Sequence, residues 1–548
     1  MGKYFLKILP LFLIFAAGIN QAQVTLQYVN LNANNINSFF YNTGIYDQDK
    51  RTSNTPGFEW PKGSNKFAIF TAGICLAAKI NGQLRQAMGS YMGEYGPGYC
   101  VDSIPSTNSN FKIYKVSAGD NQNTNPDWAN WGLMVPYGAP YVDANHNGIY
   151  EPAIDTPGVK YAASTIFICL TDGFEYTHSS GEGFGGGTLP IYAEVHLTAW
   201  AYTQTQYADM QFIKYQIINK SKKQWNNTYF SVVSDPDLGN SNDDYIGCDT
   251  VRKLGYCYNY SNNDNVYGAN PPAVGIVLLK GMYNKSVIPN KDIGMSSFGF
   301  FTNTASLGPP CEKDPNGEPG PAYLMMKGFK KDSSNWLDVR KPLGFGHYER
   351  TKFCYYGDPE GNTGWTEYFG SVQNCDMGLH DSGIAIGTNP AGDRRFIISS
   401  GAENFTVNNG DTQTVYLCQL IARGTTNLNS VTKLKQLSDV AWNLYNNNWI
   451  IGISQISSIV PDKYALFQNY PNPFNPVTKI KFKIRNKDFV KLSIFEMLGK
   501  EISTLVNERL SAGEYEINFD GSLLSSGIYY YRINAGNYSE VKKMVLLK

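Results

Sequence analysis

The sequence predicts a mainly β protein: an antiparallel β-sandwich with long loops and a helix near its C-terminal end, followed by a small immunoglobulin-like β-sandwich. Short apolar or alternating runs recur along the chain, and Gly, Asn and Asp separate them. Tyr and Phe, which favour strands, are abundant, with 38 and 29 copies. The length of 548 residues leaves room for more than one domain.

The first residues have the pattern of a secretory signal peptide. A short basic start precedes an apolar run from Ile8 to Ala17, which is too short to cross a bilayer, and Ala22 offers a cleavage point. We therefore expect residues 1–22 to be removed on export. No later stretch has the length of a membrane-spanning helix, so we expect no transmembrane segment after signal cleavage.

Residues 23–455, which we call the body, are expected to form the large sandwich, either as one unit or as two subdomains. Runs such as "STIFICLTDG", "MQFIKYQIINKS" and "TQTVYLCQLIARG" favour strands. One helix is predicted near the end of the body, with Ser430 as a residue that can cap its start. The apolar residues that follow at helical spacing are Val431, Leu434, Leu437, Ala441 and Leu444.

The stretch "YVDANHNGIYEPAIDTPG", residues 141–158, contains the strongest candidate site. Asp143, Asn145 and Asn147 place side-chain oxygens at alternate positions, and Gly148 permits a sharp turn. Calcium prefers about six to eight oxygens on such a bent loop. The remaining oxygens would come from the Ile149 carbonyl, Glu151 and Asp155. The pattern departs from that of an EF-hand after the glycine, so an Asx-rich turn without an ion is the alternative.

A second acidic stretch, "SDPDLGNSNDDYIGCD", carries five carboxylates close together in the chain. Such groups repel one another unless a cation lies between them or water screens them. The stretch is therefore either a second calcium site or a solvated loop. Its carboxylates are Asp235, Asp237, Asp243, Asp244 and Asp249.

Charge and motifs limit the functions of the body. The whole chain has 46 basic and 46 acidic residues, but its C-terminal part is basic and the body is mildly acidic, which argues against a nucleic-acid partner. No two of the five histidines have zinc-ligand spacing, and the sequence has no nucleophile elbow or phosphate-binding loop. These observations favour a non-catalytic role.

Aromatic residues of the body suggest a glycan ligand. Tryptophans on a protein surface can stack on sugar rings, although most aromatics of a β protein lie in the core. The candidates for such contacts are Trp128, Trp131, Trp336 and Trp365.

The nine cysteines all lie in the body, and disulfides are plausible in an exported chain. The pairs closest in sequence are Cys248 with Cys257 and Cys354 with Cys375. Nine is an odd number, so at least one thiol stays free. Cysteines within apolar strands, such as Cys169 and Cys418, are expected in the core.

The C-terminal part is expected to consist of a linker, residues 456–465, and an immunoglobulin-like sandwich, residues 466–548. In "TKIKFKI", Ile480, Phe482 and Ile484 alternate with lysines, which is typical of a strand with one buried face. More short strands follow, separated by turns that contain glycine. The preceding "NYPNPFNP" is rich in proline, which lacks an amide donor and cannot lie in a central strand.

The motifs of this tail occur in a fixed order: "YPNPFNPVTKI", "LSIFEMLGKEISTLVNERLSAGEYEINF", "SSGIYYYRINAG" and a basic end, "KKMVLLK". They resemble the type A C-terminal sorting domain of type IX secretion cargo in Bacteroidetes and Ignavibacteria. The resemblance implies that the type IX secretion machinery recognises the tail at the outer membrane, and that the protein is secreted or held on the outer cell surface. Several stretches of the body resemble segments of other exported proteins with such a tail. An immunoglobulin-like adhesion module is the alternative for the tail.

These observations combine into one expectation. The tail exports the protein, and the body is a calcium-stabilised β structure with a structural or binding role. The alternative is a secreted hydrolase that acts on polysaccharide through an acidic pair, since such a pair needs closeness only in space.

Overall fold

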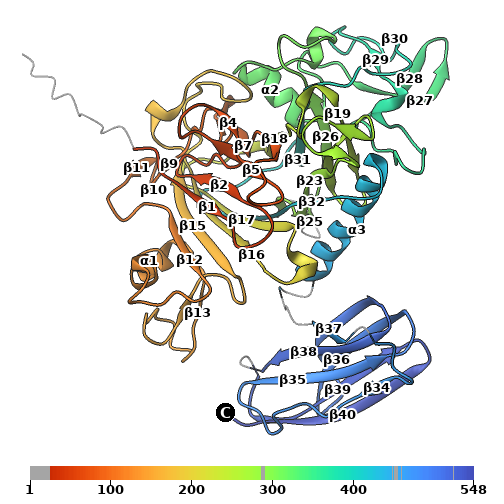
Figure 1. The fold of residues 1–548 in the computed structure, drawn as a ribbon. Coiled ribbons are helices and arrows are strands. Elements are labelled where there is room, and N and C mark those ends of the chain that lie inside the picture. Colours follow the sequence, from red (N-terminus) through yellow and green to blue (C-terminus); the bar gives the residue numbers. More distant parts are fainter. Residues whose placement is uncertain (1–24, 286–290, 447–448, 450–453, 458, 522–523) are drawn as a thin grey trace, which may run out of the picture.

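The structure, a computed structural model, describes residues 25–285, 291–446, 449, 454–457, 459–521 and 524–548 (Figure 1). The expected signal peptide, residues 1–22, lies outside these described residues. Antiparallel sheets make up most of the described chain and α-helices are few, which confirms the predicted fold class. Among the described residues, no helix combines the length and the apolar character needed to cross a membrane.

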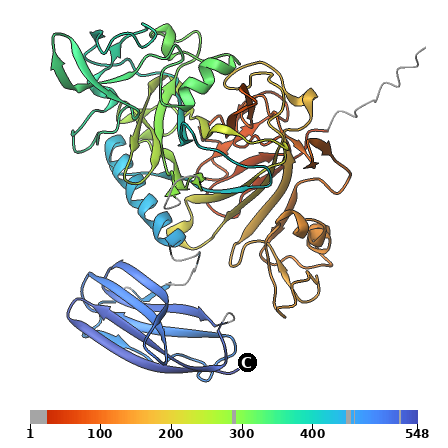
Figure 2. The ribbon, with the colours of Figure 1, turned by 180° about the vertical axis from the view of Figure 1, so that it is seen from behind.

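The body is built on two large antiparallel sheets that share one core (Figures 1 and 2). The nine-stranded sheet contains, in spatial order, β12 (Tyr114–Ser117), β15 (Ser164–Thr171), β16 (Ala193–Ala201), β17 (Met210–Asn219), β32 (Thr412–Ala422), β23 (Ala273–Lys280), β20 (Leu254–Asn259) and β19 (Asp244–Asp249), with β9 (Gly96–Pro97) paired to β15. The five-stranded sheet contains β26 (Ser297–Phe301), β31 (Arg395–Gly401), β18 (Asn226–Asp235), β7 (Thr71–Ile80) and β8 (Gln83–Met88).

Apolar residues from both sheets meet in this core. Ile213 and Ile217 of β17 belong to the same buried cluster as Phe230 and Val232 of β18. Because side chains alternate along a strand, these positions define the inward faces of the two sheets. Every residue of β16 is buried, including those that face away from the core. Burial is therefore continuous along this strand, although polar Glu194, His196 and Thr198 alternate with its apolar residues.

Helix α3 (Asn427–Asn446) covers the outer face of the nine-stranded sheet. Leu434 lies in one buried cluster with Leu420 of β32, so the helix predicted from apolar spacing is confirmed. The helix begins before Ser430, however, and this side chain is buried. The Ser430 hydroxyl donates to the Pro271 carbonyl at 2.7 Å. Ser430 therefore links the helix to the segment just before β23 by a hydrogen bond and does not cap the start of the helix.

Helix α2 (Pro319–Met326) covers the outer face of the five-stranded sheet. Its residues Tyr323 and Met326 belong to a buried cluster with Val233 and Ile397 of the sheet. The body is thus layered in the order α3, nine-stranded sheet, five-stranded sheet and α2, as Figure 1 shows.

The segment before β7 and the long loops between the main strands carry helix α1 (Pro126–Asn130) and short two-stranded pairs. The pairs are β1 (Tyr28–Leu31) with β2 (Ser38–Tyr41), β3 (Gln48–Asp49) with β4 (Thr55–Pro56), β5 (Phe58–Glu59) with β6 (Phe67–Ile69), β10 (Tyr99–Val101) with β11 (Ile104–Ser106), β13 (Tyr141–Val142) with β14 (Thr156–Pro157), β21 (Asn263–Asp264) with β22 (Gly268–Ala269), β24 (Tyr283–Asn284) with β25 (Lys291–Asp292), β27 (Trp336–Gly344) with β28 (His347–Thr351), and β29 (Val372–Gln373) with β30 (Ile384–Ala385). One of these pairs, β13 with β14, closes the first candidate site.

Two four-stranded antiparallel sheets form a separate sandwich, the C-terminal unit, drawn in blue in Figures 1 and 2. One sheet contains β33 (Ser454–Ser457), β38 (Gly513–Asp520), β35 (Val477–Ile484) and β34 (Ala465–Leu466), and the other β37 (Glu501–Leu510), β36 (Asp488–Glu496), β39 (Gly527–Ala535) and β40 (Tyr538–Leu546). In β35, Ile480, Phe482 and Ile484 are buried while Lys479 and Lys481 are exposed, as the alternation predicts. Strand β33 spans the boundary expected between body and linker, with Ser454 and Gln455 from the expected body and residues 456–457 from the expected linker, and it pairs with β38 of this unit.

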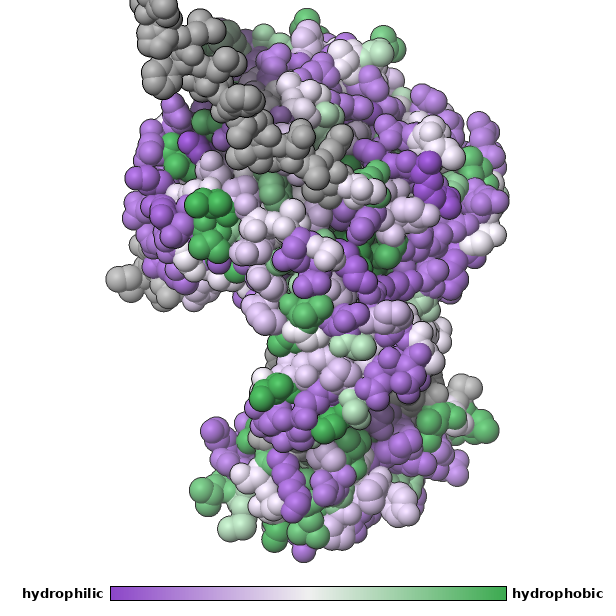
Figure 3. Space-filling model, turned by 90° about the vertical axis from the view of Figure 1, so that its left-hand side faces the viewer, coloured by the Kyte–Doolittle hydropathy of each residue, from purple (hydrophilic) through white to green (hydrophobic). Residues whose placement is uncertain are grey.

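The surface of the molecule is mainly hydrophilic on the face that Figure 3 shows. Hydrophobic residues lie there in small separate groups. An obligate protein interface usually has a large continuous apolar patch, and the described residues visible on this face do not form one.

Candidate metal centres

Strands β13 and β14 pair with each other and close the loop that contains the first set of predicted calcium ligands. Asp143 accepts hydrogen bonds from the backbone amides of Asn147 and Gly148, at 3.2 and 2.7 Å. The side-chain amides of Asn145 and Asn147 both donate to Glu151 Oε2 at 2.6 Å. Several side chains of the predicted set therefore meet inside one short loop.

Gly148 and Asp155 shape this loop. Gly148 has a φ of 76°, a left-handed conformation that glycine adopts without strain. Asp155 is 2% exposed, and its oxygens accept from the backbone amides of Ala144 and Glu151, at 2.9 and 2.7 Å. The Asp155 carboxylate thus joins the two ends of the loop, and both its oxygens are engaged. The Ile149 side chain is exposed.

The second acidic stretch begins where β18 ends, beside the start of its antiparallel neighbour β31. Continuing the register past the Ser234–Phe396 pair sets Asp235 beside Arg395 and Asp237 beside Asp393. Carboxylate oxygens of Asp235, Asp237 and Asp393 lie within 4.8 Å of one another. We call these three residues the carboxylate cluster. It unites two residues of the predicted site with one from a distant part of the chain.

Arg395 and Tyr91 bind one side of the cluster. Arg395 Nη2 lies 3.4 Å from Asp235 Oδ2, and Arg395 Nη1 lies 3.1 Å from Asp393 Oδ2. The Tyr91 hydroxyl donates to the same Asp235 oxygen at 2.8 Å and accepts from Arg395 Nε at 3.0 Å. Glu182 Oε1 is a further partner of the guanidinium, at 3.4 Å. One arginine therefore contacts three carboxylates, and the cluster adds a fourth.

Two buried oxygens of the cluster lack a hydrogen-bond partner among the described residues. These atoms are Asp235 Oδ1 and Asp393 Oδ1. Burial raises the pKa of Asp235 well above its ordinary value, although Arg395 lowers it. Burial and then the Asp393 charge raise the pKa of Asp237 to about 7. Burial is the larger cause of both shifts, so these two carboxyl groups are costly to ionise here without a further positive charge.

The other three residues of the predicted acidic site lie outside the cluster. Asp243 lies in a short 3₁₀ turn before β19. Asp244 is buried and accepts from the backbone amide of Leu238 at 3.2 Å. Asp249, at the opposite end of β19, forms an ion pair with Arg252 at 2.9 Å. The structure therefore brings together Asp235 and Asp237. Asp244 lies beside them without being part of the cluster, since it bonds to the amide next to Asp237 and its carbonyl accepts from the amide of Gly392.

Three of the four tryptophans proposed as glycan contacts are core residues. Trp131, Trp336 and Trp365 are at most 1% exposed, so the expectation of surface stacking is wrong for them. Trp128 is partly buried, and its indole donates to the Pro152 carbonyl at 3.0 Å. The abundance of aromatic residues reflects core packing at these positions.

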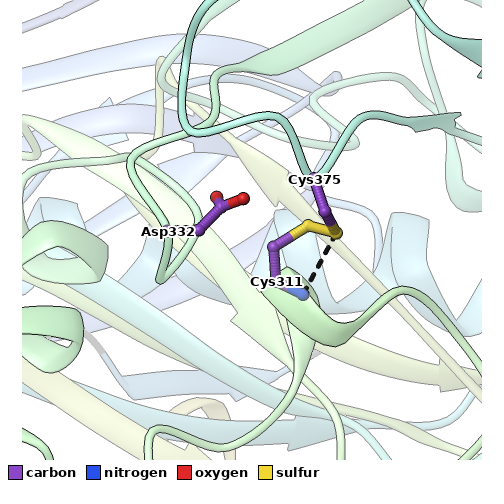
Figure 4. A group of neighbouring side chains, drawn as sticks. All are labelled: Cys311, Asp332 and Cys375. Carbon is purple, nitrogen blue, oxygen red and sulfur yellow. Dashed lines mark hydrogen bonds between the residues drawn. A yellow bond between two sulfur atoms is a disulfide. The ribbon is translucent and has the colours of Figure 1, made fainter.

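One disulfide joins Cys311 to Cys375, with Asp332 beside it (Figure 4). The two sulfur atoms are bonded to each other, so neither is available as a thiolate ligand for a metal. The group is therefore a cross-link between two loops of the body. The other seven cysteines are free and buried, among them Cys169 and Cys418, as expected.

The disulfide pairs suggested by sequence proximity were wrong. Cys248 lies opposite Gly255 in the pairing of β19 with β20, and not opposite Cys257. Cys354 is a free, buried thiol, because the partner of Cys375 comes from another loop. Proximity in sequence is a weak guide here, since strand register decides which side chains face each other.

Residues 468–547 match the family model described as a secretion system C-terminal sorting domain. The protein is a type IX secretion cargo. Its C-terminal unit is the sorting domain, as the resemblance of the motifs implied. The cargo is accordingly secreted or held at the cell surface, and the sorting domain interacts with the type IX machinery.

The other comparisons assign no role to the body of this cargo. No curated protein matches the chain. Among solved structures, Escherichia coli alpha-2-macroglobulin activated by porcine elastase is similar at 9% sequence identity, with a TM-score of 0.11. The match covers 95% of the cargo and 44% of the macroglobulin chain, so the cargo spans less than half the length of that protein. A likeness with so low a TM-score carries no argument.

Sequence reasoning missed Asp393, Arg395 and Tyr91 as neighbours of the acidic stretch. The only local signal is the run "GDRRF", in which charged residues directly precede an apolar strand. Only the pairing of β31 with β18 places that run beside the acidic stretch, and a single sequence does not specify this pairing.

Proposed function

We propose that the body of this cargo is a calcium-stabilised module with a structural or binding role, presented at the cell surface by the sorting domain. The observation that supports calcium most directly is the convergence of Asn145 and Asn147 on Glu151 Oε2. Carboxylate and amide oxygens are the ligands that Ca²⁺ prefers, and a loop closed by paired strands can hold them together.

The side-chain amides of the loop can turn to serve a cation. Half a turn of each amide exchanges its nitrogen and oxygen, and it breaks the bonds that Asn145 Oδ1 and Asn147 Oδ1 now accept from the backbone amides of Asn147 and Ile149. The amide oxygens of Asn145 and Asn147 would then occupy the places of the two nitrogens that now donate to Glu151. A cation between these oxygens and Glu151 would replace the two amide donors as the partner of the Glu151 carboxylate. Asp143, in the same loop, is a further carboxylate that could bind the ion.

A structural role fits the position of the loop in the body. Tyr150, inside the loop, packs against the apolar cluster around Trp131, and its hydroxyl donates to the Trp128 carbonyl at 2.7 Å. That cluster covers β12 and β15 at one edge of the nine-stranded sheet. An ion that orders the loop would therefore also hold this edge in place.

Thermal melts of the purified protein in calcium and in chelator test the proposal. Extracellular modules bind calcium with Kd values of about 0.1–1 mM. An ion bound only by the folded state adds about 1.4 kcal/mol at a tenfold excess over Kd, which about 1–10 mM calcium provides. We expect millimolar calcium to raise Tm by a few degrees.

The variant Asp143→Ala should lose most of this rise while remaining folded. A matched control is Asp439→Ala, which removes an exposed carboxylate on α3 that is remote in sequence from the loop. The control should keep the calcium effect. Equal melting temperatures of the wild type in calcium and in chelator would contradict the proposal.

A further inference from the structure

We infer that the carboxylate cluster, Asp235, Asp237 and Asp393, binds a hard divalent cation at the edge of the five-stranded sheet. This site is separate from the loop at Asp143 and goes beyond the proposed function, which rests on that loop. Three carboxylates from two neighbouring chain segments offer oxygen ligands only, and Ca²⁺ and Mg²⁺ select oxygen.

The unpartnered oxygens indicate where the ion would be held. Tyr91 and Arg395 both engage Asp235 Oδ2, and Arg395 also contacts Asp393 Oδ2. The second oxygens, Asp235 Oδ1 and Asp393 Oδ1, are buried and have no partner in the described part of the chain. Buried polar atoms of folded proteins nearly always have one. A cation between the carboxylates would satisfy both oxygens at once.

The charges around the cluster favour the same conclusion. Arg395 supplies one positive charge, whereas Glu182 and the three carboxylates of the cluster are all acidic. Like charges at such short separations are costly in a partly buried place. A divalent ion would bring the group close to balance, which the single guanidinium does not achieve.

The cluster is also accessible and held in position. Asp237 and Asp393 are only partly buried and Glu182 is exposed, so a hydrated ion can reach the site from solvent. Water can complete the coordination shell around three protein ligands. Arg395 contacts both Asp235 and Asp393, and thereby orients these carboxylates before an ion binds.

Calorimetric titration of the full-length protein tests this inference. The protein is first treated with a chelator and then titrated with CaCl₂ and, separately, with MgCl₂. The Asp143→Ala variant is used as the background, because it removes the contribution of the loop. We expect this background to bind one equivalent of at least one of the two ions.

Two further substitutions assign that binding to the cluster. Adding Asp393→Asn keeps the shape of the side chain but removes its charge, and it should weaken binding roughly tenfold or more. The matched control is Asp249→Asn, which changes another carboxylate that is paired with an arginine. The control should bind as the background does. Asp237→Asn replaces Asp393→Asn if near-ultraviolet circular dichroism shows that the latter is not folded.

The outcomes separate this inference from the proposed function. The inference is overturned if the Asp143→Ala background binds neither ion, or if the cluster variants bind as the background does. The cluster would then be a group of carboxylates that share protons without an ion. Binding that survives Asp143→Ala and is lost in the cluster variants supports it, even if the loop itself binds nothing.

Discussion

Ser234 of β18 lies directly opposite Phe396 of β31 in the five-stranded sheet. Because the strands are antiparallel, the acidic segment that follows Ser234 runs alongside the charged segment that precedes Phe396. Asp235 and Asp393 come from these two segments, and they share Arg395 as a partner. The register of one strand pair therefore creates the carboxylate cluster.

The stability of the metal-free protein should depend on the protonation of Asp237. Burial, and then the charge of Asp393, raise its pKa to about 7, while Arg395 lowers it. The folded state thus holds a proton that the unfolded chain releases at its ordinary pKa of about 3.9. This contribution is fully present below about pH 4 and is lost as the pH rises through about 7.

Urea unfolding midpoints in chelator, measured between about pH 4 and pH 8, check this prediction. Asp237→Asn should flatten the part of the pH profile that falls as the pH rises. Asp439→Asn, at an exposed position, should leave the profile as it is in the wild type. Parallel profiles for Asp237→Asn and the wild type would show that this carboxylate does not titrate between the two states.

Loss of the Cys311–Cys375 disulfide should destabilise the body. The two cysteines are 64 residues apart in sequence, and the chain-entropy relation gives about 4 kcal/mol for a loop of that length. The measurement is urea unfolding of the wild type with and without reductant. The double variant Cys311→Ser/Cys375→Ser should match the reduced wild type and should not respond to reductant. Equal midpoints for oxidised and reduced wild type would contradict the prediction.

Leu434→Ala should lower the free energy of unfolding by about 2–5 kcal/mol, because it leaves a cavity between α3 and the nine-stranded sheet. Lys433→Ala, one residue earlier on the exposed side of the helix, is the control and should change it by about 0.5 kcal/mol or less. Chemical denaturation of both variants provides the comparison. A small effect of Leu434→Ala would mean that the helix is not part of the cooperative unit.

The sorting domain should be more stable when it starts at Ser454 than when it starts at Leu466. Removal of the intervening residues deletes β33 and leaves one edge of β38 without its partner. Fusions of the two fragments to the same reporter allow thermal melts of the domain to be compared. The longer fragment should melt at the higher temperature, whereas identical melts would show that β33 adds nothing to the sandwich.

Features encoded by neighbouring residues could be predicted from the sequence. The alternation in β35 and the helical spacing in α3 depend on residues two to four positions apart. The loop that begins at Asp143 is likewise one continuous segment, so the sequence identified its residues together. The sorting domain has its own ordered motifs, and its family model confirms the prediction.

Features that depend on distant contacts could not be predicted in the same way. Asp393 joins Asp235 and Asp237 only through strand pairing, and Cys311 meets Cys375 only because two loops pack together. Three of the four tryptophans failed as glycan contacts for a related reason. Residue type indicates the tendency to be buried, but the tertiary structure decides which aromatic side chains reach the surface.

The cysteine inventory of the body has a consequence for its biogenesis. Among nine cysteines, only one pair is joined and seven thiols are buried in the folded state. Before folding, every thiol of the exported chain is exposed to an oxidising compartment and can form a wrong pair. Such pairs must be reshuffled by thiol–disulfide exchange before the sheets close over them. The folding rate of the body therefore sets how long its seven free thiols can take part in wrong pairs.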